Sequence, residues 1–283
     1  KPVRYFVTTN GLALDQSFLK EAQARQLNIA LSLDGHGRGH DLTRTLPDGS
    51  GSFDLLARQF PMILAANPAI EILVTFTPAN ISYLADGIEK LYYCGFKIFM
   101  IGPNYEEEWS PASLEIMRTE YQKLGRFYEE RFEHNEYVYI STIDGKIASH
   151  ARPGCEICSC CDKNDGEIAV APSGNLYPCL RFVKGDEDSS LLIGTLKGGI
   201  DKKRRAKIMM EAAKEWPECV PCGYRGRCFH YCSAVNYKCG GAFNRPSPAL
   251  CRHEQTAIVL ADEIGTRLYK KENVAFLKRF YGR

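Results

Sequence analysis

The sequence lacks the features that point to a membrane, a nucleic acid or export. No apolar run approaches the ~18 residues that a membrane-spanning helix needs. The formal net charge is only +2, so there is no excess of one sign to attract a polyanion or a lipid surface. No segment shows the charged, apolar and small-residue order of a secretory signal. We therefore expect no membrane partner and no nucleic-acid partner.

Cysteine is almost absent from the first half of the chain. All but Cys94 of the 12 cysteines lie between Cys155 and Cys251. This segregation excludes a disulfide framework that staples the whole chain. Cys94 itself is interpreted as a small buried hydrophobic residue. For the clustered cysteines three interpretations remain, namely iron–sulfur ligands, zinc ligands or disulfides.

Residues 1–135 have the pattern of βα units. Short apolar runs alternate with segments of helical period, which predicts a parallel sheet covered by helices. Strands are expected at residues 5–9, 28–34, 70–77 and 96–102. These runs are nearly continuous, as in strands that are covered on both faces. Helices are expected after Ser52, after Asn80 and from Ser110, where a serine cap precedes a proline.

Residues 136–283 form a second part of different texture. Glycine, proline and cysteine become dense, and helical periodicity fades until residue 201. A β-hairpin is expected within residues 167–179, around the turn at Gly174. Helices are expected near residues 206–215 and 254–269. The sequence thus predicts a βα part followed by an irregular, cysteine-rich part with a C-terminal helix.

The cysteine spacing separates the three interpretations. The array contains Cys219-x2-Cys222-x5-Cys228-x3-Cys232 and then Cys251, with Cys155-x2-Cys158-x-Cys160-Cys161 and Cys179 upstream. A zinc ribbon pairs two Cys-x2-Cys knuckles, and using both pairs here leaves the remaining cysteines without a role. Disulfides are the weakest option, because the clustered cysteines are odd in number and nothing marks the chain as secreted. Iron–sulfur is favoured, with zinc as its competitor.

The spacing Cys161-x12-Gly174-x4-Cys179, then Cys219 to Cys232, then Cys251, resembles the seven-cysteine signature of the SPASM domain. This domain is the auxiliary-cluster extension of radical S-adenosylmethionine (SAM) enzymes that modify peptides and proteins. The resemblance implies two auxiliary [4Fe–4S] clusters with interleaved ligands. One set would be Cys161, Cys179 and Cys232 with an upstream cysteine, for which Cys155 has the family-like spacing, and the other Cys219, Cys222, Cys228 and Cys251. Cys158, Cys160 and Cys239 fall outside the pattern.

The first part is similar to the third and fourth strands of the radical SAM partial barrel. The similarity lies in Thr8-Thr9-Asn10-Gly11, Leu31-Ser32-Leu33-Asp34-Gly35 and His40-Asp41-Leu42-Thr43-Arg44. Such barrels place functional residues at the C-terminal ends of their strands, where we expect Ser32, Asp34 and Thr77. The resemblance implies that Ser32 faces the ribose or amino-acid part of SAM and that Arg44 pairs with its carboxylate. Asn80 follows the next strand and is placed to reach the same cofactor.

One element of radical SAM chemistry is absent from this sequence. No Cys-x3-Cys-x2-Cys loop, whose cluster binds SAM, occurs in it. Because the chain begins just before a strand that resembles the third of the barrel, we expect a truncation by roughly two βα units. As given, the chain would hold auxiliary clusters without cleaving SAM.

For the intact protein, the resemblance implies an oxidoreductase that matures a peptide or protein. A ribosomal-peptide maturase that forms thioether or similar crosslinks is favoured, with SAM, a third cluster and a reducing partner such as ferredoxin or flavodoxin. Oxygen-labile clusters and the lack of a signal favour the cytoplasm of an anaerobe. A sulfatase-maturing enzyme is the nearest alternative, but Leu180 stands where that branch carries an aspartate after Cys179. A non-catalytic, zinc-stabilised binding module is the other alternative.

Overall fold

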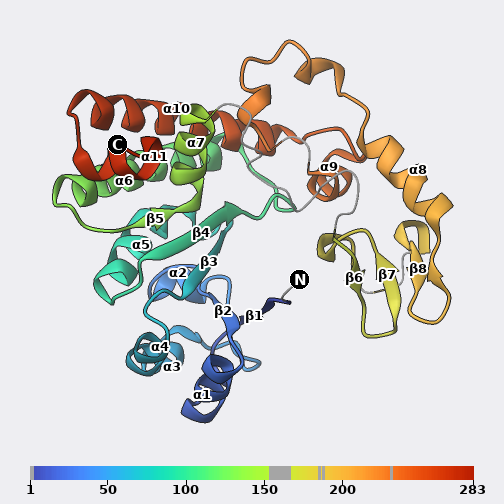
Figure 1. Ribbon diagram of the computed structural model, residues 1–283, viewed down its shortest axis with the longest axis horizontal. Helices are drawn as coiled ribbons and strands as arrows, with labels where there is room; N and C mark the ends of the chain where they lie inside the picture. Colours follow the sequence, from blue (N-terminus) through green and yellow to red (C-terminus); the bar gives the residue numbers. More distant parts are fainter. Residues whose placement is uncertain (1–2, 153–166, 184–185, 187–188, 230–231) are drawn as a thin grey trace. The chain divides into compact units, whose positions relative to one another are not determined.

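Figure 1 shows the computed structural model, which describes residues 3–152, 167–183, 186, 189–229 and 232–283. The chain divides into two units. The βα unit comprises Lys1–Ala151 and Thr256–Arg283, and the cysteine-rich unit comprises Arg152–Gln255. The chain thus leaves the βα unit once and returns to it at its C-terminus.

A five-stranded parallel sheet forms the centre of the βα unit. Its strands are β1 (Tyr5–Thr9), β2 (Leu27–Ser32), β3 (Glu71–Phe76), β4 (Ile98–Pro103) and β5 (Tyr139–Ile140). Their order in space is their order in the sequence. All the strands therefore end at one edge of the sheet, the edge at which folds of this kind place functional residues.

Helices connect these strands and cover the sheet. They are α1 (Gln16–Ala24), α2 (Arg38–Asp41), α3 (Phe53–Ala57), α4 (Phe60–Ala66), η1 (Ile81–Tyr83), α5 (Leu84–Tyr93), α6 (Pro111–Glu133), α7 (Ser141–Ala151), α10 (Pro248–Lys270) and α11 (Val274–Tyr281). As the sequence predicts, the Ser110 hydroxyl caps α6 by accepting a hydrogen bond from the N–H of Ser113. Asn80 makes no such cap for η1, because its side chain is used elsewhere.

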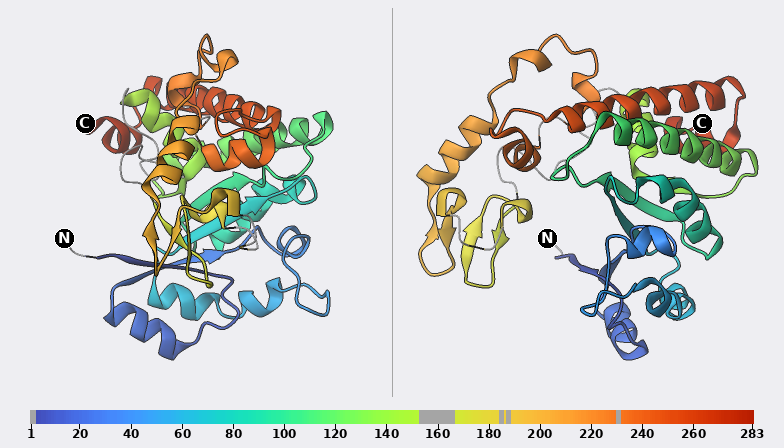
Figure 2. Two further views of the ribbon diagram at one scale, coloured as in Figure 1. Left: turned by 90° about the vertical axis from the view of Figure 1, so that its right-hand side faces the viewer. Right: turned by 180° about the vertical axis from the view of Figure 1, so that it is seen from behind.

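The core of the βα unit is one continuous apolar cluster. Leu31, Ile72 and Phe99 of the strands are fully buried in it, together with residues of α6, α10 and α11. α6 and α10 run side by side (Figure 2) and approach closely at Gly125. A Cβ at that position would come within 3.0 Å of Leu260 Cδ1, so glycine permits the close packing of the two helices. The C-terminal helices therefore complete the core that β2, β3 and β4 begin.

The cysteine-rich unit is built from short elements. A four-stranded antiparallel sheet contains β6 (Ala169–Val170), β7 (Asn175–Tyr177), β8 (Gly194–Thr195) and β9 (Gly199–Ile200). The helices are η2 (Leu180–Phe182), η3 (Ser189–Leu191), α8 (Lys202–Ala212), η4 (Pro217–Cys219), η5 (Arg225–Arg227) and α9 (Ser233–Gly240). Leu176 of β7, Ile193 before β8 and Ile208 of α8 form a small apolar cluster, and Phe243 packs against it.

The predicted fold class is confirmed, since a parallel βα sheet precedes an antiparallel, cysteine-rich part. The expectation that helical periodicity fades at the start of the second part is wrong for 141–151, which form α7. Asp144 stabilises the start of α7 by accepting a hydrogen bond from the N–H of Ile140 at 2.7 Å.

The predicted division after residue 135 also differs from the structure, which keeps β5, α7 and residues 256–283 with the βα unit. Their apolar side chains, such as Ile264, belong to its core.

Two further observations concern single features. Cys94, which was expected to be buried, is exposed at the C-terminal end of α5. Within the described residues, no helix combines the length and the apolar character required to cross a bilayer.

Candidate functional site

The predicted SAM-binding residues lie at the C-terminal edge of the parallel sheet. Ser32 is the last residue of β2, and Thr77 directly follows β3. Asp34 lies two residues beyond β2, and Arg44 follows α2 in the connection to α3. The structure thus brings residues from separate parts of the sequence to one edge, as parallel strands in sequential order require.

Asp34 is the centre of a hydrogen-bond network at this edge. The side chain of Asp34 is 4% exposed, and the guanidinium of Arg44 binds it with two donors, Nε to Oδ2 at 2.7 Å and Nη2 to Oδ1 at 3.1 Å. Thr43 Oγ1 donates to Oδ2 at 3.0 Å, and the N–H of Thr75 donates to Oδ1 at 2.8 Å. This carboxylate therefore joins β2, β3 and the segment after α2, and its burial is offset by a bidentate ion pair.

Arg44 has capacity for a second anion. A guanidinium carries five N–H donors in one plane, and two of them point to Asp34. The remaining donors, on Nη1 and Nη2, have no partner among the described residues. The side chain of Arg44 is 30% exposed, so these donors have capacity for a ligand carboxylate.

Asn80 and Ser32 take different roles at the edge. Asn80 is buried, with Oδ1 accepting from the N–H of Thr77 at 2.7 Å and Nδ2 donating to the carbonyl of Gly39 at 3.1 Å. Its amide therefore links the end of β3 to α2, and its hydrogen-bonding atoms are occupied by these main-chain contacts. The hydroxyl of Ser32 has no hydrogen-bond partner within the part of the chain that the structure describes, and the residue is half-buried. Ser32, like Arg44, therefore has free hydrogen-bonding capacity at this edge.

His40 and Ser52 belong to this edge and were not singled out from the sequence. His40 is 1% exposed, and burial lowers its pKa to about 4. Its ring lies between the N–H of Asp34 and the hydroxyl of Ser52. A histidine four residues before Arg44 was visible as part of the motif, but the contact with Ser52 depends on how the intervening loop closes.

The cysteines of the second predicted set gather in the cysteine-rich unit. Burial raises the pKa of Cys251, and the nearby thiols of Cys219 and Cys222 raise it further. The pKa of Cys219 is raised by burial and then by Cys222. These three thiols are therefore close enough for their charges to interact. Cys228, the fourth member, directly follows η5 and is half-buried.

The first predicted set is described only in part. Cys155 and Cys161 lie outside the described residues, as do Cys158 and Cys160. Burial raises the pKa of Cys179, and the nearby Cys232 adds a smaller rise. Electrostatic contacts therefore join Cys251 with Cys219 and Cys222, and Cys179 with Cys232.

The donors fit a thiolate-bound cluster in kind. Soft thiolate sulfur is the ligand that iron–sulfur clusters and zinc take in proteins. Among the described residues, no three histidine, cysteine or carboxylate side chains converge on one metal position. The described part of the array therefore supplies suitable donors in neighbouring positions, without a closed coordination sphere.

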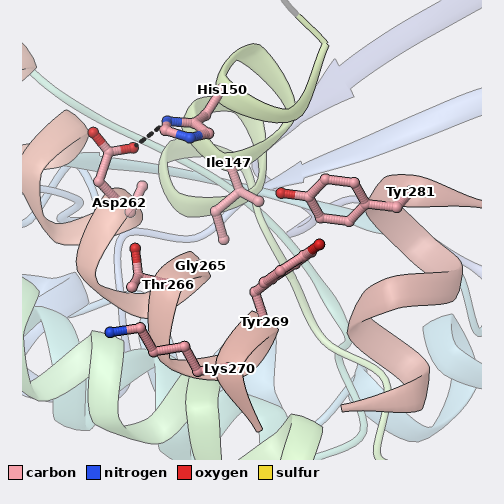
Figure 3. Close-up of a pocket in the computed structure, with 9 residues that line it drawn as sticks. Ile147, His150, Asp262, Gly265, Thr266, Tyr269, Lys270 and Tyr281 are labelled. Atoms are coloured by element: carbon pink, nitrogen blue, oxygen red, sulfur yellow. Dashed lines mark ion pairs between the residues drawn. The ribbon is translucent and has the colours of Figure 1, made fainter. Parts of the chain in front are cut away.

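A pocket of about 340 Å³ lies elsewhere in the βα unit, between α7, α10 and α11. Figure 3 shows His150 and Asp262 at one end of it, with Nδ1 and Oδ1 3.1 Å apart, and Tyr269 and Tyr281 on another wall. Nothing in the sequence predicts it. Its walls come from helices, so it is distinct from the strand edge at Asp34.

No family model and no curated protein matches this chain. Solved structures do match, and they show that the chain has the fold of radical SAM/SPASM peptide maturases. Native anSMEcpe with bound AdoMet, that is SAM, superposes with a TM-score of 0.75 over 96% of this chain and 75% of that chain, at 19% identity. Streptococcus suis SuiB bound to precursor peptide SuiA gives a TM-score of 0.53 over 88% of this chain and 59% of that chain, at 13% identity.

Proposed function

We propose that this chain is part of a radical SAM maturase that modifies a peptide or protein and carries two auxiliary [4Fe–4S] clusters. The observation that supports it most is the C-terminal strand edge around Asp34, where Arg44 has guanidinium donors that no described residue uses and Ser32, at the end of β2, has an unpaired hydroxyl. One fold thus combines donors for a SAM carboxylate with thiols in a separate unit. Bound SAM would supply the 5′-deoxyadenosyl radical that this class of enzyme uses.

In this proposal the edge residues divide the work of binding SAM. Ser32 and Arg44 hold it, because each has hydrogen-bonding capacity that no described residue uses. Asp34 orients Arg44 through the bidentate pair, and Asn80 with Thr77 keeps the end of β3 against the loop that carries Arg44. None of these groups needs to change protonation to bind the cofactor.

The auxiliary clusters would use the two interleaved cysteine sets. Cys219, Cys222, Cys228 and Cys251 would hold one, and Cys179 and Cys232 with Cys155 and Cys161 the other. The electrostatic contacts of Cys251 with Cys219 and Cys222, and of Cys179 with Cys232, support this division. Four thiolates per cluster leave no open iron, which fits an electron-transfer role. A ferredoxin- or flavodoxin-type reductant in the cytoplasm would exchange electrons with them.

The substrate is proposed to be a ribosomal peptide, with a thioether or similar crosslink as the product. Peptides are present in the solved structures of anSMEcpe with the Cp18Cys peptide and of SuiB with SuiA. Leu180, which follows Cys179, is 71% exposed and has no ionisable group. A sulfatase-maturing reaction that needs a carboxylate base there is therefore disfavoured.

The test is the metal content of the anaerobically purified protein and of two matched cysteine variants. We expect a brown protein with about eight auxiliary irons per chain, four for each cluster. Cys219→Ser should lose about four of them, whereas Cys94→Ser, which changes a thiol in the βα unit outside the array, should lose none. A colourless protein with stoichiometric zinc would overturn the proposal in favour of a zinc-stabilised module.

A further inference from the structure

A chain of three hydrogen bonds runs from the main chain of Asp34 to the main chain of Arg44. The N–H of Asp34 donates to Nδ1 of His40 at 3.2 Å. Nε2 of His40 lies 3.0 Å from Oγ of Ser52, and that hydroxyl donates to the carbonyl of Arg44 at 2.8 Å. His40 and Ser52 are both buried. The two residues of the bidentate ion pair are thus joined a second time, through their backbones.

The direction of these bonds fixes the state of the histidine. Nδ1 of His40 accepts a hydrogen bond from the main-chain N–H of Asp34, so it carries no proton itself. Nε2 must then be the protonated nitrogen, and it donates a hydrogen bond to Oγ of Ser52. The Ser52 hydroxyl in turn donates to the carbonyl of Arg44. A charged imidazolium would turn an N–H toward the N–H of Asp34. The arrangement therefore requires a neutral ring in the Nε2–H tautomer, which agrees with the burial of the side chain.

We propose that His40 and Ser52 are positioning residues that hold the backbone of Arg44 so that its outer guanidinium edge faces a ligand carboxylate. This inference rests on the proposed SAM site. The side chain of Arg44 is fixed at one edge by Asp34, and its carbonyl is fixed by Ser52. Two points of attachment leave the guanidinium plane little freedom to rotate. The entropy cost of aligning it with a carboxylate is then met on folding instead of on binding.

The loop that carries Arg44 is also closed by contacts that do not involve the Ser52 side chain. Substitution of Ser52 should therefore leave the loop folded. Asp41 Oδ1 accepts a hydrogen bond from the N–H of Phe53 at 2.9 Å, and Thr45 pairs with Gly51 in an isolated β-bridge. Both contacts close the same loop without Ser52. We therefore expect Ser52→Ala to release the carbonyl of Arg44 without unfolding the loop.

The experiment compares the binding of SAM and of decarboxylated SAM to the cluster-loaded protein by anaerobic calorimetry. Ser52→Ala is expected to weaken SAM about fivefold, the effect of one hydrogen bond, and to leave decarboxylated SAM unchanged. Ser50→Ala is the matched control, because that hydroxyl donates to Asp48 in the same loop and contacts neither His40 nor Arg44 among the described residues. Arg44→Lys should remove the preference for SAM over its decarboxylated analogue. Nitrogen-15 NMR of His40 should show one protonated ring nitrogen, Nε2.

The outcomes separate this inference from the proposed function. If Ser52→Ala weakens both ligands equally, or neither, while Arg44→Lys abolishes the preference, the positioning role is overturned and the SAM site stands. A protonated Nδ1 in His40 overturns the positioning role as well. If the unmodified protein shows no preference for SAM, or Arg44→Lys leaves that preference intact, the proposed SAM site itself is overturned.

Discussion

The two units of this chain differ in the extent of the apolar core that stabilises their folds. The βα unit has a continuous apolar core that runs from β2 to α11 and contains large buried aromatics such as Tyr121, Phe99 and Phe276. The described part of the cysteine-rich unit has two- and three-residue strands, and its apolar cluster of Leu176, Ile193 and Ile208 is small. Small cores offset little of the conformational entropy lost on folding, which is why small domains often add metals or disulfides.

The same difference appears in how each unit places its functional groups. Asp34 and Arg44 are held by hydrogen bonds on strands and loops whose positions the core already fixes. Two of the cysteines instead belong to short helical turns, since Cys219 ends η4 and Cys228 directly follows η5. In the first unit the fold creates the site. In the second unit, on the proposed function, the clusters would create the fold.

Removal of the clusters should therefore produce the largest loss of structure, and this loss should be confined to the cysteine-rich unit. Treatment with a chelator and oxidant is expected to expose the cysteine-rich unit to hydrogen exchange, including the amide of Ile193, which bonds to the carbonyl of Leu176. Amides between β3 and β4 should stay protected, because no metal supports them. Mass spectrometry of exchanged peptides would follow both. Equal loss of protection in the two units would contradict the contrast, and unchanged protection in both would contradict a structural role for metal.

The second prediction compares one truncation in each core. Ile72 of β3 and Ile193 before β8 are both fully buried. Ile72→Ala should lower the free energy of unfolding by about 3–4 kcal/mol, because the surrounding core is extensive and cannot collapse into the cavity. Ile193→Ala should cost about 2 kcal/mol while the clusters are bound, since fewer apolar neighbours are lost.

The two tryptophans allow the two truncations to be read separately. Trp109 belongs to the βα unit and Trp216 to the cysteine-rich unit. Urea titrations of Trp216→Phe and Trp109→Phe backgrounds would therefore each report one unit. A larger loss for Ile193→Ala than for Ile72→Ala would show that the cysteine-rich unit depends on its core more than its size indicates.

The third prediction concerns pH and the site within the βα unit. Burial lowers the pKa of His40 from 6.5 to about 4, with Asp34, Arg44 and Asp41 facing the ring. In the unfolded chain the His40 ring takes up a proton more readily than in the folded chain. Its contribution to the free energy of unfolding is therefore fully present above pH 6.5 and is lost as the pH falls toward 4. Between pH 7 and pH 5 we expect a loss of about 2 kcal/mol.

Asp144 acts in the opposite sense and requires a control. Burial raises its pKa from 3.8 to about 6, so the folded chain gains relative stability as the pH falls through that window. The measurement is therefore the difference between the unmodified protein and His40→Gln in urea unfolding at both pH values, since both proteins contain Asp144. Equal pH dependence of the two proteins would show that His40 does not titrate as its burial implies.

The sequence predicts the strands well because their signal is local. The run at residues 28–34 is long and apolar, and β2 lies within one residue of its expected start. β5 has two residues, too few for any periodicity, and it owes its place to pairing with Ile98 and Phe99. α7 did leave a readable signal, Ser141-x-x-Asp144, which is typical of a helix start. This signal is weak beside the cysteine-rich segment that begins at residue 155.

The candidate site was predictable as a set of residues but not as a network. Ser32 and Arg44 could be assigned to a strand end and a loop from their motif. The motif did not reveal that Asp34 would occupy one edge of the Arg44 guanidinium, because that contact depends on how the loop folds back. Ser52 was used only as the start of a helix, yet its hydroxyl contacts the carbonyl of Arg44. Long-range closure of this kind leaves no periodic trace in a sequence.

The smallest predicted effect compares one helix cap in each unit. Ser110 caps α6 through the N–H of Ser113, and Asp201 caps α8 through the N–H groups of Lys203 and Arg204, both at 3.0 Å. Either cap changed to alanine should cost about 1 kcal/mol.

The two caps differ in charge, and this difference isolates the electrostatic contribution. α8 begins with a run of basic residues, Lys202 to Arg205, at the end of the helix where the dipole is also positive. Asp201 is the carboxylate that opposes this charge, so Asp201→Asn should keep the cap but cost about 0.5 kcal/mol. That cost should shrink in 1 M salt, whereas the cost of Ser110→Ala should not. Urea unfolding at two salt concentrations measures both, and a salt-independent cost for Asp201→Asn would mean that the hydrogen bonds alone account for the cap.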